Sequence, residues 1–490
     1  MNGLTSWMEK YILPVAAKIG AQKHLVALRD AFIGTLPATM AGSVAVMINA
    51  IIRDLPQQFN STYADSLAAD KGIFAVLNVI IGINGFVWNG TLAIAGLIFA
   101  FSWGYNLARA YGVNDLAGGI VGLATLIQGI SFGPALSAAL DVNVPSNVAD
   151  AINSSEIGAT IADGTLSVGL WGWLKLDHLN GNAYFTVMIM GAISVIIFCK
   201  LMLANITIKM PDSVPPAVSK AFAAILPATI ALYVIAIINY IVGRVADGQL
   251  IIDLVQKYIA EPFLGLSQGL GAVLIVTVFV QVFWFFGIHG PNVLAPVLEG
   301  IWGQAQLINI DIFQKGYNGK TGTPAVLDAI EDGKAYMWVR GSFDAFAWFG
   351  GSGGTIVLLI AILIFSKRAD YLTVAKLSIG PGIFNINEPV MFGLPIVLNA
   401  IMFIPFLIAP VVATAIGWLA TYFGLVAPVS QQVTWVVPPF LLSFLATGAD
   451  WRAPIVTLVC MVVCMVVTFL IWAPFVISAN KMDPAAGEQQ

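Results

Sequence analysis

Long apolar stretches recur along most of this chain, separated by shorter polar segments. A helix needs about 20 predominantly apolar residues to cross the hydrocarbon core of a bilayer, and these stretches have that length. The pattern therefore predicts an all-α polytopic membrane protein, because a spanning helix satisfies its own backbone hydrogen bonds. The clearest candidate spans are residues 31–52, 85–108, 115–140, 182–206, 221–243, 263–286, 341–366, 401–425 and 453–479.

Four weaker apolar pieces are interrupted by glycine, proline and asparagine. They lie near residues 73–83, 287–308, 380–400 and 432–448. Non-helical backbone at membrane depth is tolerated only where it lines a cavity or is buried in protein. These pieces therefore predict where the protein keeps irregular backbone.

The first 30 residues follow a different pattern. Their apolar positions recur at helical spacing, while the charged residues fall on other faces. We therefore predict an amphipathic interfacial helix over residues 1–30, lying on the membrane surface. A signal peptide is not expected, since a compact basic region, a single apolar core and a cleavage site are missing. The apolar positions are Leu4, Trp7, Met8, Tyr11, Ile12, Val15 and Ile19.

Lysine and arginine cluster beside three of the predicted spans. Such clusters mark the cytoplasmic side, so we place the N-terminus, a linker over residues 207–220 and the segment that follows span 341–366 in the cytoplasm. We expect the tail 481–490 on the same side. The polar segments 54–70 and 141–181 then fall outside. The clustered residues are Lys10, Lys18, Lys23 and Arg29, then Lys200, Lys209 and Lys220, and finally Lys367, Arg368 and Lys376.

Composition supports a membrane location and argues against several other classes. Of the 490 residues, 59% are hydrophobic and 10% are charged, where a soluble protein carries about 25% charged residues. The net charge of −4 and the lack of a basic stripe argue against binding to nucleic acid. Cys199, Cys460 and Cys464 lie in apolar runs with too few other ligands for a metal site. We expect neither a metal nor a cofactor.

The first segment with distinctive chemistry runs from Phe283 to Asn292, with the sequence FWFFGIHGPN. Gly287, Gly290 and Pro291 should break a helix and turn the backbone around His289. A buried histidine bonded to a carbonyl is one interpretation. However, an ionisable group within a membrane is costly and usually faces a water-filled path. We therefore predict a functional role for His289.

The second segment runs from Gly382 to Asn399 and contains an Asn-Glu-Pro motif. Glu388 is the only acid in residues 371–449. Pro389 moves the backbone of Glu388 toward an extended conformation, so this glutamate is not in a helix interior. A structural hairpin in which Glu388 caps a helix is the alternative to a binding site.

Both segments suit a sugar as the ligand. Sugar hydroxyls donate and accept hydrogen bonds, so a site for them needs carboxylate and amide groups. Pyranose rings also have apolar faces that pack on aromatic rings, although a tryptophan can equally serve as an interfacial anchor. An early membrane segment adds polar groups that could alternatively allow close helix packing. The candidate catalytic residues are Glu388 and His289, and the candidate substrate-binding residues are Asn387, Trp284, Asn89, Gly90 and Trp435.

On these motifs the chain resembles enzyme IIC, the membrane permease of the lactose, cellobiose and diacetylchitobiose branch of the phosphotransferase system. The pairing of the histidine segment with the Asn-Glu-Pro motif is more specific than either alone. The resemblance extends from the first helix to about residue 480, while segment 141–181 is longer and more polar than expected. The matching pieces are Trp284–Gly290, Asn387–Pro395, Pro211–Pro216, Asn89–Thr91 and Gly350–Thr355.

The resemblance implies a homodimer with about ten transmembrane helices and two re-entrant hairpins. Residues 31–206 would form the scaffold and dimerisation domain. Residues 221–480 would form the transport domain, which would hold the sugar and move across the membrane by an elevator-type motion. His289 on the first hairpin and Glu388 on the second would contact the sugar's 6-hydroxyl.

The resemblance also implies a partner. A phosphocysteine on a separate enzyme IIB would donate the phosphate, since we expect no IIB domain in this chain. Cellobiose, diacetylchitobiose, lactose and an aryl β-glucoside all stay open as substrates. A proton-coupled glycoside symporter, with Glu388 or His289 as the proton carrier, is the main alternative function.

Overall fold

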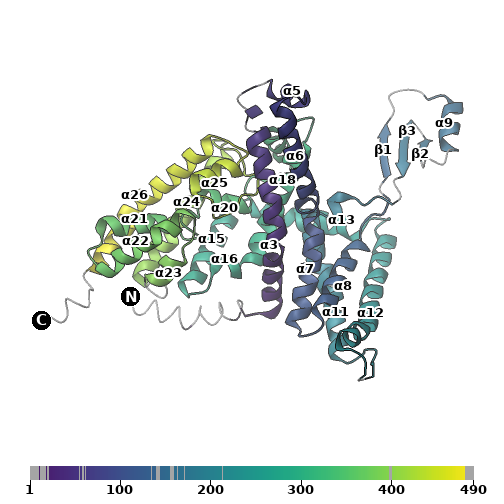
Figure 1. The fold of residues 1–490 in the computed structure, drawn as a ribbon, viewed down its shortest axis with the longest axis horizontal. Helices are drawn as coiled ribbons and strands as arrows, with labels where there is room; N and C mark the ends of the chain where they lie inside the picture. The colour runs from purple at the N-terminus through teal and green to yellow at the C-terminus, as the bar shows by residue number, and fades with distance from the viewer. Residues whose placement is uncertain are drawn as a thin grey trace. The chain divides into compact units, whose positions relative to one another are not determined.

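Helices dominate the computed structural model, as the apolar pattern predicts, and the all-α class is confirmed apart from one small sheet (Figure 1). Five helices among the described residues are long and apolar enough to cross a membrane: Lys23–Arg53, Ile73–Ala110, Gly181–Leu203, Pro216–Val245 and Pro405–Tyr422. A sixth crossing is possible where Ile251–Ser267 and Leu270–Phe285 meet at 79°. The total of ten stays a prediction. The structure describes residues 10, 18, 21–54, 56–57, 60, 62–133, 135–139, 144–154, 159–162, 164–169, 172–211, 213–394, 396 and 400–480.

The chain divides into two compact units. Unit 1 joins Met1–Ala93 to Glu261–Gln490, and unit 2 is Ile94–Ala260. A division by packing does not show which unit is a scaffold and which transports the substrate. The functional division into residues 31–206 and 221–480 therefore stays a prediction.

Unit 1 is built from helices that pack through both apolar and amide side chains. The Asn84 Nδ2 donates to Asn49 Oδ1 at 2.8 Å, which joins α6 to α3 inside the unit. α21 packs against both α22 and α26 (Figure 1). The helices are α3 (Lys23–Asn49), η1 (Ala50–Asp54), α5 (Tyr63–Ala68), α6 (Ile73–Asn89), α14 (Glu261–Ser267), α15 (Leu270–Phe285), α16 (Gly290–Val293), α17 (Ala295–Val297), η7 (Leu298–Gly303), α18 (Gln304–Lys315), α19 (Thr323–Glu331), α20 (Arg340–Phe346), α21 (Thr355–Phe365), α22 (Ala369–Ile383), α23 (Glu388–Gly393), α24 (Ala400–Tyr422), α25 (Pro439–Ala446) and α26 (Arg452–Asn480).

Unit 2 contains a helical bundle whose first two helices approach closely. A Cβ atom on Gly104 would lie 2.3 Å from the Gly118 carbonyl oxygen, so small residues are required where these helices cross. The Asn114 side chain caps the second helix by accepting from the Ala117 N–H. The helices are α7 (Ala95–Ala110), α8 (Asp115–Ile127), α9 (Ser146–Asn153), η3 (Leu176–His178), η4 (Gly181–Ala183), α10 (Tyr184–Thr186), η5 (Val187–Gly191), α11 (Ala192–Leu203), α12 (Pro216–Val245), α13 (Ile251–Val255) and η6 (Gln256–Ala260), with η2 (Leu92–Ile94) at the sequence boundary between the units.

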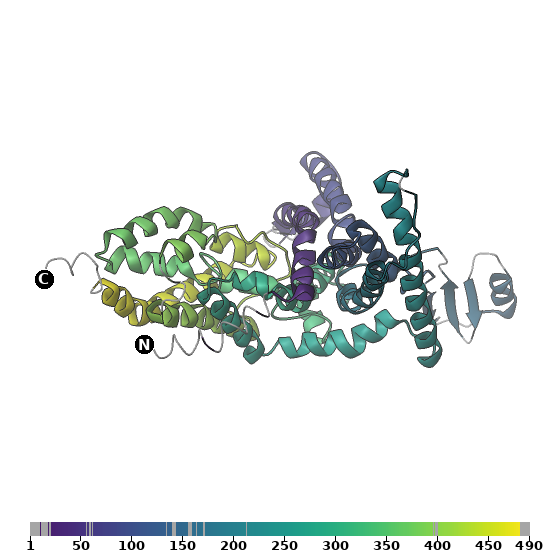
Figure 2. The ribbon, with the colours of Figure 1, turned by 90° about the horizontal axis from the view of Figure 1, so that it is seen from below.

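A three-stranded antiparallel sheet belongs to unit 2 and corrects one predicted span. β1 (Ala135–Ala139) pairs with β3 (Thr165–Gly169), which pairs with β2 (Ala159–Ala162). Beside α9, the sheet projects from this unit's helices in both views (Figure 1, Figure 2). The predicted span 115–140 is therefore wrong in its second half, because α8 ends at Ile127 and the later residues pair with β3.

The predicted span 341–366 is also broken. α20 ends at Phe346 and α21 begins at Thr355, with the loop Gly350–Gly354 between them. Gly350, Gly351 and Gly354 have φ values of 77°, 103° and 61°, which residues with a side chain rarely adopt. The apolar pattern continues through this loop, but its glycines do not continue the helix.

Two predicted regions fall largely or wholly outside the described residues. They are the interfacial helix over residues 1–30 and the tail 481–490. The predicted linker over 207–220 is partly described, and it leads into α12, which begins at Pro216. Proline suits the first turn of a helix, since its missing N–H would have no helical partner there.

Candidate functional site

Two interrupted segments bring His289 and Glu388 together within unit 1. α15 ends at Phe285, and Gly287, with a φ of 73°, turns the chain so that His289 caps α16. Glu388 is the first residue of α23. The His289 Nε2 lies 3.9 Å from Glu388 Oε1, and the two side chains are 37% and 46% exposed. Both groups can therefore reach the same ligand atom.

The cap on α16 determines which nitrogen of His289 carries the proton. The backbone N–H of Asn292 donates to His289 Nδ1 at 3.2 Å. An accepting Nδ1 carries no proton, so the neutral ring is protonated at Nε2, the atom that faces Glu388. An oxygen between the two side chains could then accept from His289 and donate to Glu388.

Trp284 lies behind His289. The two ring centroids are 4.6 Å apart, and the indole Nε1 donates to Ser352 Oγ at 2.7 Å. The indole is only 1% exposed. Trp284 therefore orients His289 in this structure, and its predicted direct contact with a sugar stays a prediction.

A cavity of about 420 Å³ opens in front of these side chains. This size is within the usual range for small-molecule sites. Trp435 is 42% exposed, so its ring can provide an apolar face to a ligand. The described lining consists of Ile33, Leu36, His289, Pro291, Asn292, Arg340, Asp344, Trp348, Gly351, Ser352, Asn385, Asn387, Glu388 and Trp435.

One asparagine joins three irregular segments around the cavity. Asn385 Oδ1 accepts from the Gly350 N–H at 2.8 Å. Asn385 Nδ2 donates to the carbonyl oxygens of Trp435 at 2.7 Å and Val437 at 2.9 Å. The positions of Trp435 and the Asn-Glu-Pro motif are thereby linked through a side chain that the motif analysis did not identify.

Asn387 has an unused donor at the edge of this cavity. A Cβ atom on Gly351 would lie 2.6 Å from Asn387 Cβ, so the glycine allows the two loops to touch. The side chain is 4% exposed, and its Nδ2 has no hydrogen-bond partner. Leaving a buried donor unpaired is costly, so a ligand oxygen would be a favourable acceptor here.

Arg340 adds a charged network that the motif analysis missed. Its guanidinium donates to Glu299 at 2.8 Å and to Asp344 at 2.9 Å, and lies 4.8 Å from the Trp348 ring centroid. A charged pair at i and i+4 at the start of an apolar stretch was the signal that could have identified it. The pairing neutralises Arg340 within the cavity wall.

The structure thus places four of the predicted residues on one cavity and leaves three away from its described lining. His289, Glu388, Asn387 and Trp435 line it, and Trp284 lies behind. Asn89 ends α6 and Gly90 is its cap, both exposed, so their part in binding stays a prediction. Among the described residues, no cluster of three or more histidine, cysteine or acidic side chains could hold a metal ion.

Comparison with known proteins identifies the family. A sequence profile described as "Phosphotransferase system, EIIC" matches residues 29–410. The chain belongs to this EIIC family. The predicted family and the membrane sugar permease are therefore confirmed.

Several EIIC proteins are similar to this chain over nearly its whole length. The cellobiose-specific EIIC component of Lactococcus lactis subsp. lactis (strain IL1403) is 53% identical, covering 99% of each chain. The oligo-beta-mannoside-specific EIIC component of Bacillus subtilis (strain 168) is 30% identical, covering 99% of this chain and 96% of that protein. The crystal structure of the transporter ChbC, the IIC component from the N,N'-diacetylchitobiose-specific phosphotransferase system, matches with a TM-score of 0.80 and 30% identity, covering 98% of this chain and 99% of the other.

Proposed function

We propose that this EIIC takes up a β-linked disaccharide, with cellobiose as the first candidate, and presents its 6-hydroxyl for phosphorylation by an enzyme IIB phosphocysteine. The 53% identity to a cellobiose-specific EIIC component supports the substrate class. The observation that carries the proposal is the His289–Glu388 pair, 3.9 Å apart, on a cavity that also includes Asn387 and Trp435.

The pair suits the chemistry of phosphoryl transfer. Glu388 accepts the proton of the 6-hydroxyl as that oxygen attacks phosphorus. The new O–P bond forms while the S–P bond of the phosphocysteine breaks, and the electron pair leaves with the thiolate. Positioning and charge stabilisation dominate such reactions, and His289 Nε2–H contributes by donating to the same sugar oxygen.

The remaining binding groups orient the rest of the sugar. Trp435 provides an apolar face, and Asn387 Nδ2 donates to a hydroxyl or ring oxygen. Phosphorylation gives the product a negative charge that the apolar protein interior and bilayer disfavour, so it leaves to the cytosol.

The partners and the transport mechanism complete the proposal. IIB approaches from the cytoplasm, where both termini lie, and the protein works as a homodimer. Residues 221–480 carry the sugar past the scaffold formed by residues 31–206. Apolar residues exposed on α12 at helical spacing, Tyr233, Ile237, Tyr240 and Ile241, support contact of this helix with lipid or a second copy.

The substitution Glu388→Gln tests the role of the carboxylate. It retains the size of the side chain but removes the proton acceptor, so we expect cellobiose phosphorylation to fall about 100-fold or more, with a smaller loss of binding. Phosphorylation is measured with purified IIB and membranes that contain the variant. Glu261→Gln, at an exposed glutamate outside the cavity lining, is the matched control. Near-normal phosphorylation by Glu388→Gln would remove Glu388 from this role.

A further inference from the structure

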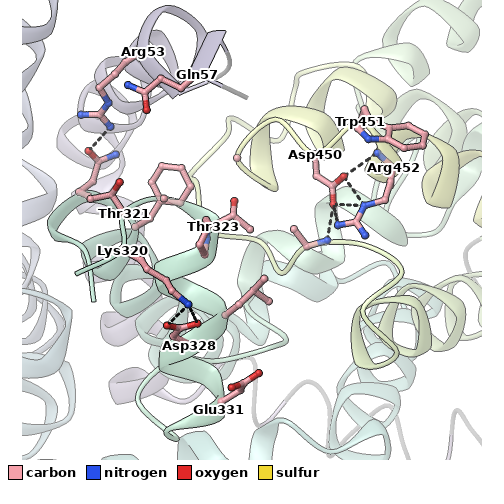
Figure 3. Close-up of a pocket in the computed structure, with 17 residues that line it drawn as sticks. Arg53, Gln57, Lys320, Thr321, Thr323, Asp328, Glu331, Asp450, Trp451 and Arg452 are labelled. Carbon is pink, nitrogen blue, oxygen red and sulfur yellow. Dashed lines mark hydrogen bonds and ion pairs between the residues drawn. The ribbon is translucent and has the colours of Figure 1, made fainter. Parts of the chain in front are cut away.

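A second and larger cavity, of about 880 Å³, lies within unit 1 (Figure 3). It is bounded by the end of η1, the turn between α18 and α19, and the turn between α25 and α26. Its described lining has no residue in common with that of the Glu388 cavity. The lining comprises Arg53, Gln57, Phe313, Gln314, Lys320, Thr321, Gly322, Thr323, Pro324, Leu327, Asp328, Glu331, Ala427, Gly448, Asp450, Trp451 and Arg452.

The Glu388 cavity lies beside the middle of the membrane-spanning helix Lys23–Arg53, and the larger cavity lies at its C-terminal end. Ile33 and Leu36 line the Glu388 cavity, and Arg53 lines the larger one. The helical rise of 1.5 Å per residue puts Leu36 and Arg53 about 25 Å apart, so the two cavities lie at different depths along this helix. Because the Lys23 end of this helix is predicted to be cytoplasmic, the larger cavity faces the outside.

The charges around this cavity cancel. Lys320 Nζ lies 2.8 Å from Asp328 Oδ2, and Arg452 lies 2.8 Å from Asp450 Oδ2 (Figure 3). Burial alone would raise the pKa of Asp450, but hydrogen bonds from Arg452 and the Ala427 N–H hold that pKa below its ordinary value. The three basic residues Arg53, Lys320 and Arg452 are thus balanced by the three acids Asp328, Glu331 and Asp450. A balanced lining favours a neutral polar ligand over a phosphate or a cation.

The remaining groups match a polyhydroxyl ligand. Gln314 Oε1 accepts from Arg53 at 3.2 Å, while its Nε2 is buried without a partner. Thr321 and Thr323 add hydroxyls that can donate and accept. Trp451 is 64% exposed, so its indole face is open to a sugar ring.

The walls of the cavity are held together by a close contact. Gly448 has a φ of 68°, and a Cβ atom there would lie 2.7 Å from the Phe313 ring and 3.1 Å from Thr323 Oγ1. The glycine therefore lets the turn before α26 touch α18 and the start of α19. The backbone of this turn thus packs directly against the Phe313 and Thr323 side chains in the cavity wall.

We propose that this cavity is an outer sugar-binding site, where an incoming β-linked disaccharide binds before it reaches the Glu388 cavity. The proposal rests on the proposed function for the sugar class. Trp451 packs against one face of the sugar, and the paired charges and threonines exchange hydrogen bonds with its hydroxyls.

Protection of an engineered cysteine tests the site directly. Thr321→Cys places a thiol on the exposed rim, and the three native cysteines are buried. A membrane-impermeant maleimide is added to intact cells that express the full-length variant, with and without cellobiose. We expect saturating cellobiose to slow labelling at least 5-fold. An unchanged labelling rate in cells that take up cellobiose normally, or labelling only after the inner face is exposed, would overturn the proposal.

A second set of variants separates direct occupancy from a conformational signal. In the Thr321→Cys background, Trp451→Ala should raise the half-protecting cellobiose concentration about 10-fold, whereas Trp451→Phe should restore most of the protection. Trp173→Ala, at another exposed tryptophan, is the matched control and should have no effect. If His289→Ala changes the half-protecting cellobiose concentration and Trp451→Ala does not, protection reports binding in the Glu388 cavity and the proposal is wrong.

The same cells distinguish failure of this site from failure of the proposed function. Normal uptake of cellobiose without protection contradicts the outer site alone. Protection by cellobiose without phosphoenolpyruvate-dependent uptake contradicts the proposed transport of cellobiose and supports the outer site.

Discussion

At the scale of single residues, His289 and Glu388 offer a sugar hydroxyl complementary hydrogen bonds. The Asn292 N–H occupies His289 Nδ1, so Nε2 is the donor, while the Glu388 carboxylate can only accept when ionised. A hydroxyl between them satisfies both groups. A methyl group in place of the hydroxymethyl group leaves both side chains without a hydrogen-bond partner.

A sugar that lacks the 6-hydroxyl tests this pairing. Compared with cellobiose, a 6-deoxy analogue should lose about 1–3 kcal/mol of binding free energy for each polar group that it leaves without a partner. His289→Ala should then weaken cellobiose binding strongly and 6-deoxycellobiose binding little. Calorimetry on the four combinations gives a coupling energy, which we expect within the range of about 0.5–3 kcal/mol found for groups in contact. Losses that simply add would place His289 at another part of the sugar.

The two tryptophans should respond differently to truncation. Trp435→Ala removes an exposed face and should weaken sugar binding by about 1–2 kcal/mol, by analogy with stacking of bases on aromatic rings, with Trp435→Phe close to wild type. Trp284→Ala empties a buried site, so we expect the free energy of unfolding to fall by about 3–5 kcal/mol. Sugar titrations and thermal unfolding in detergent separate the two effects. A pure loss of affinity in Trp284→Ala would give that residue the stacking role.

The sequence predicted part of the candidate site, because an ionisable side chain within a membrane segment is costly and usually has a functional reason. His289 and Glu388 are ionisable residues beside helix breakers in apolar surroundings, and that combination has few structural explanations. Arg340 and Asp344 were missed despite their i and i+4 spacing, because they lie at the start of a stretch that otherwise resembles an ordinary span. Asn385 gave no signal, since its three hydrogen bonds join segments far apart in the sequence.

At the scale of elements, the glycine loop between α20 and α21 determines where the Asn-Glu-Pro segment can lie. Gly350 donates to Asn385, and Gly351 lies against Asn387. The loop therefore forms part of the cavity wall and holds the Asn-Glu-Pro segment in place.

Gly351→Ala tests this support. The new Cβ atom would lie 2.6 Å from Asn387, and the alanine would have to adopt a φ of 103°, which L-residues rarely do. The loop must therefore shift. We expect cellobiose phosphorylation to fall 10-fold or more and the melting temperature to drop. Gly380→Ala, where no atom lies within 4 Å of the added carbon, should be neutral or slightly stabilising. Equal behaviour of the two variants would contradict a role for the loop in shaping the site.

The hydrophobic pattern predicted most of the long helices, but it did not predict where an apolar segment changes from helix to strand. Residues 115–140 are apolar enough for a span, yet the helix ends at Ile127 and residues 135–139 form β1, because strand pairing with β3 satisfies the same backbone groups. Pairing partners that are 32 residues apart, such as Leu136 and Val168, leave no periodic signal in a single stretch.

At the scale of the whole molecule, family membership and cavity chemistry lead to the same account. Membership of the EIIC family makes this chain a sugar permease of the phosphotransferase system. In the proposed mechanism, the His289–Glu388 pair, 3.9 Å apart, activates a hydroxyl of the sugar. Family membership makes the proton-coupled symporter unnecessary as an explanation, although the same two ionisable groups would also serve a symporter.

The most direct test is the chemical form in which cellobiose enters a closed compartment. Right-side-out membrane vesicles that contain this EIIC are loaded with phosphoenolpyruvate and the soluble phosphotransfer proteins, including IIB, and are given labelled cellobiose outside. We predict that cellobiose accumulates as the 6-phosphate, that uptake stops when IIB is omitted, and that a protonophore has little effect. Accumulation of unmodified cellobiose that collapses with the proton gradient and does not need IIB would contradict the account.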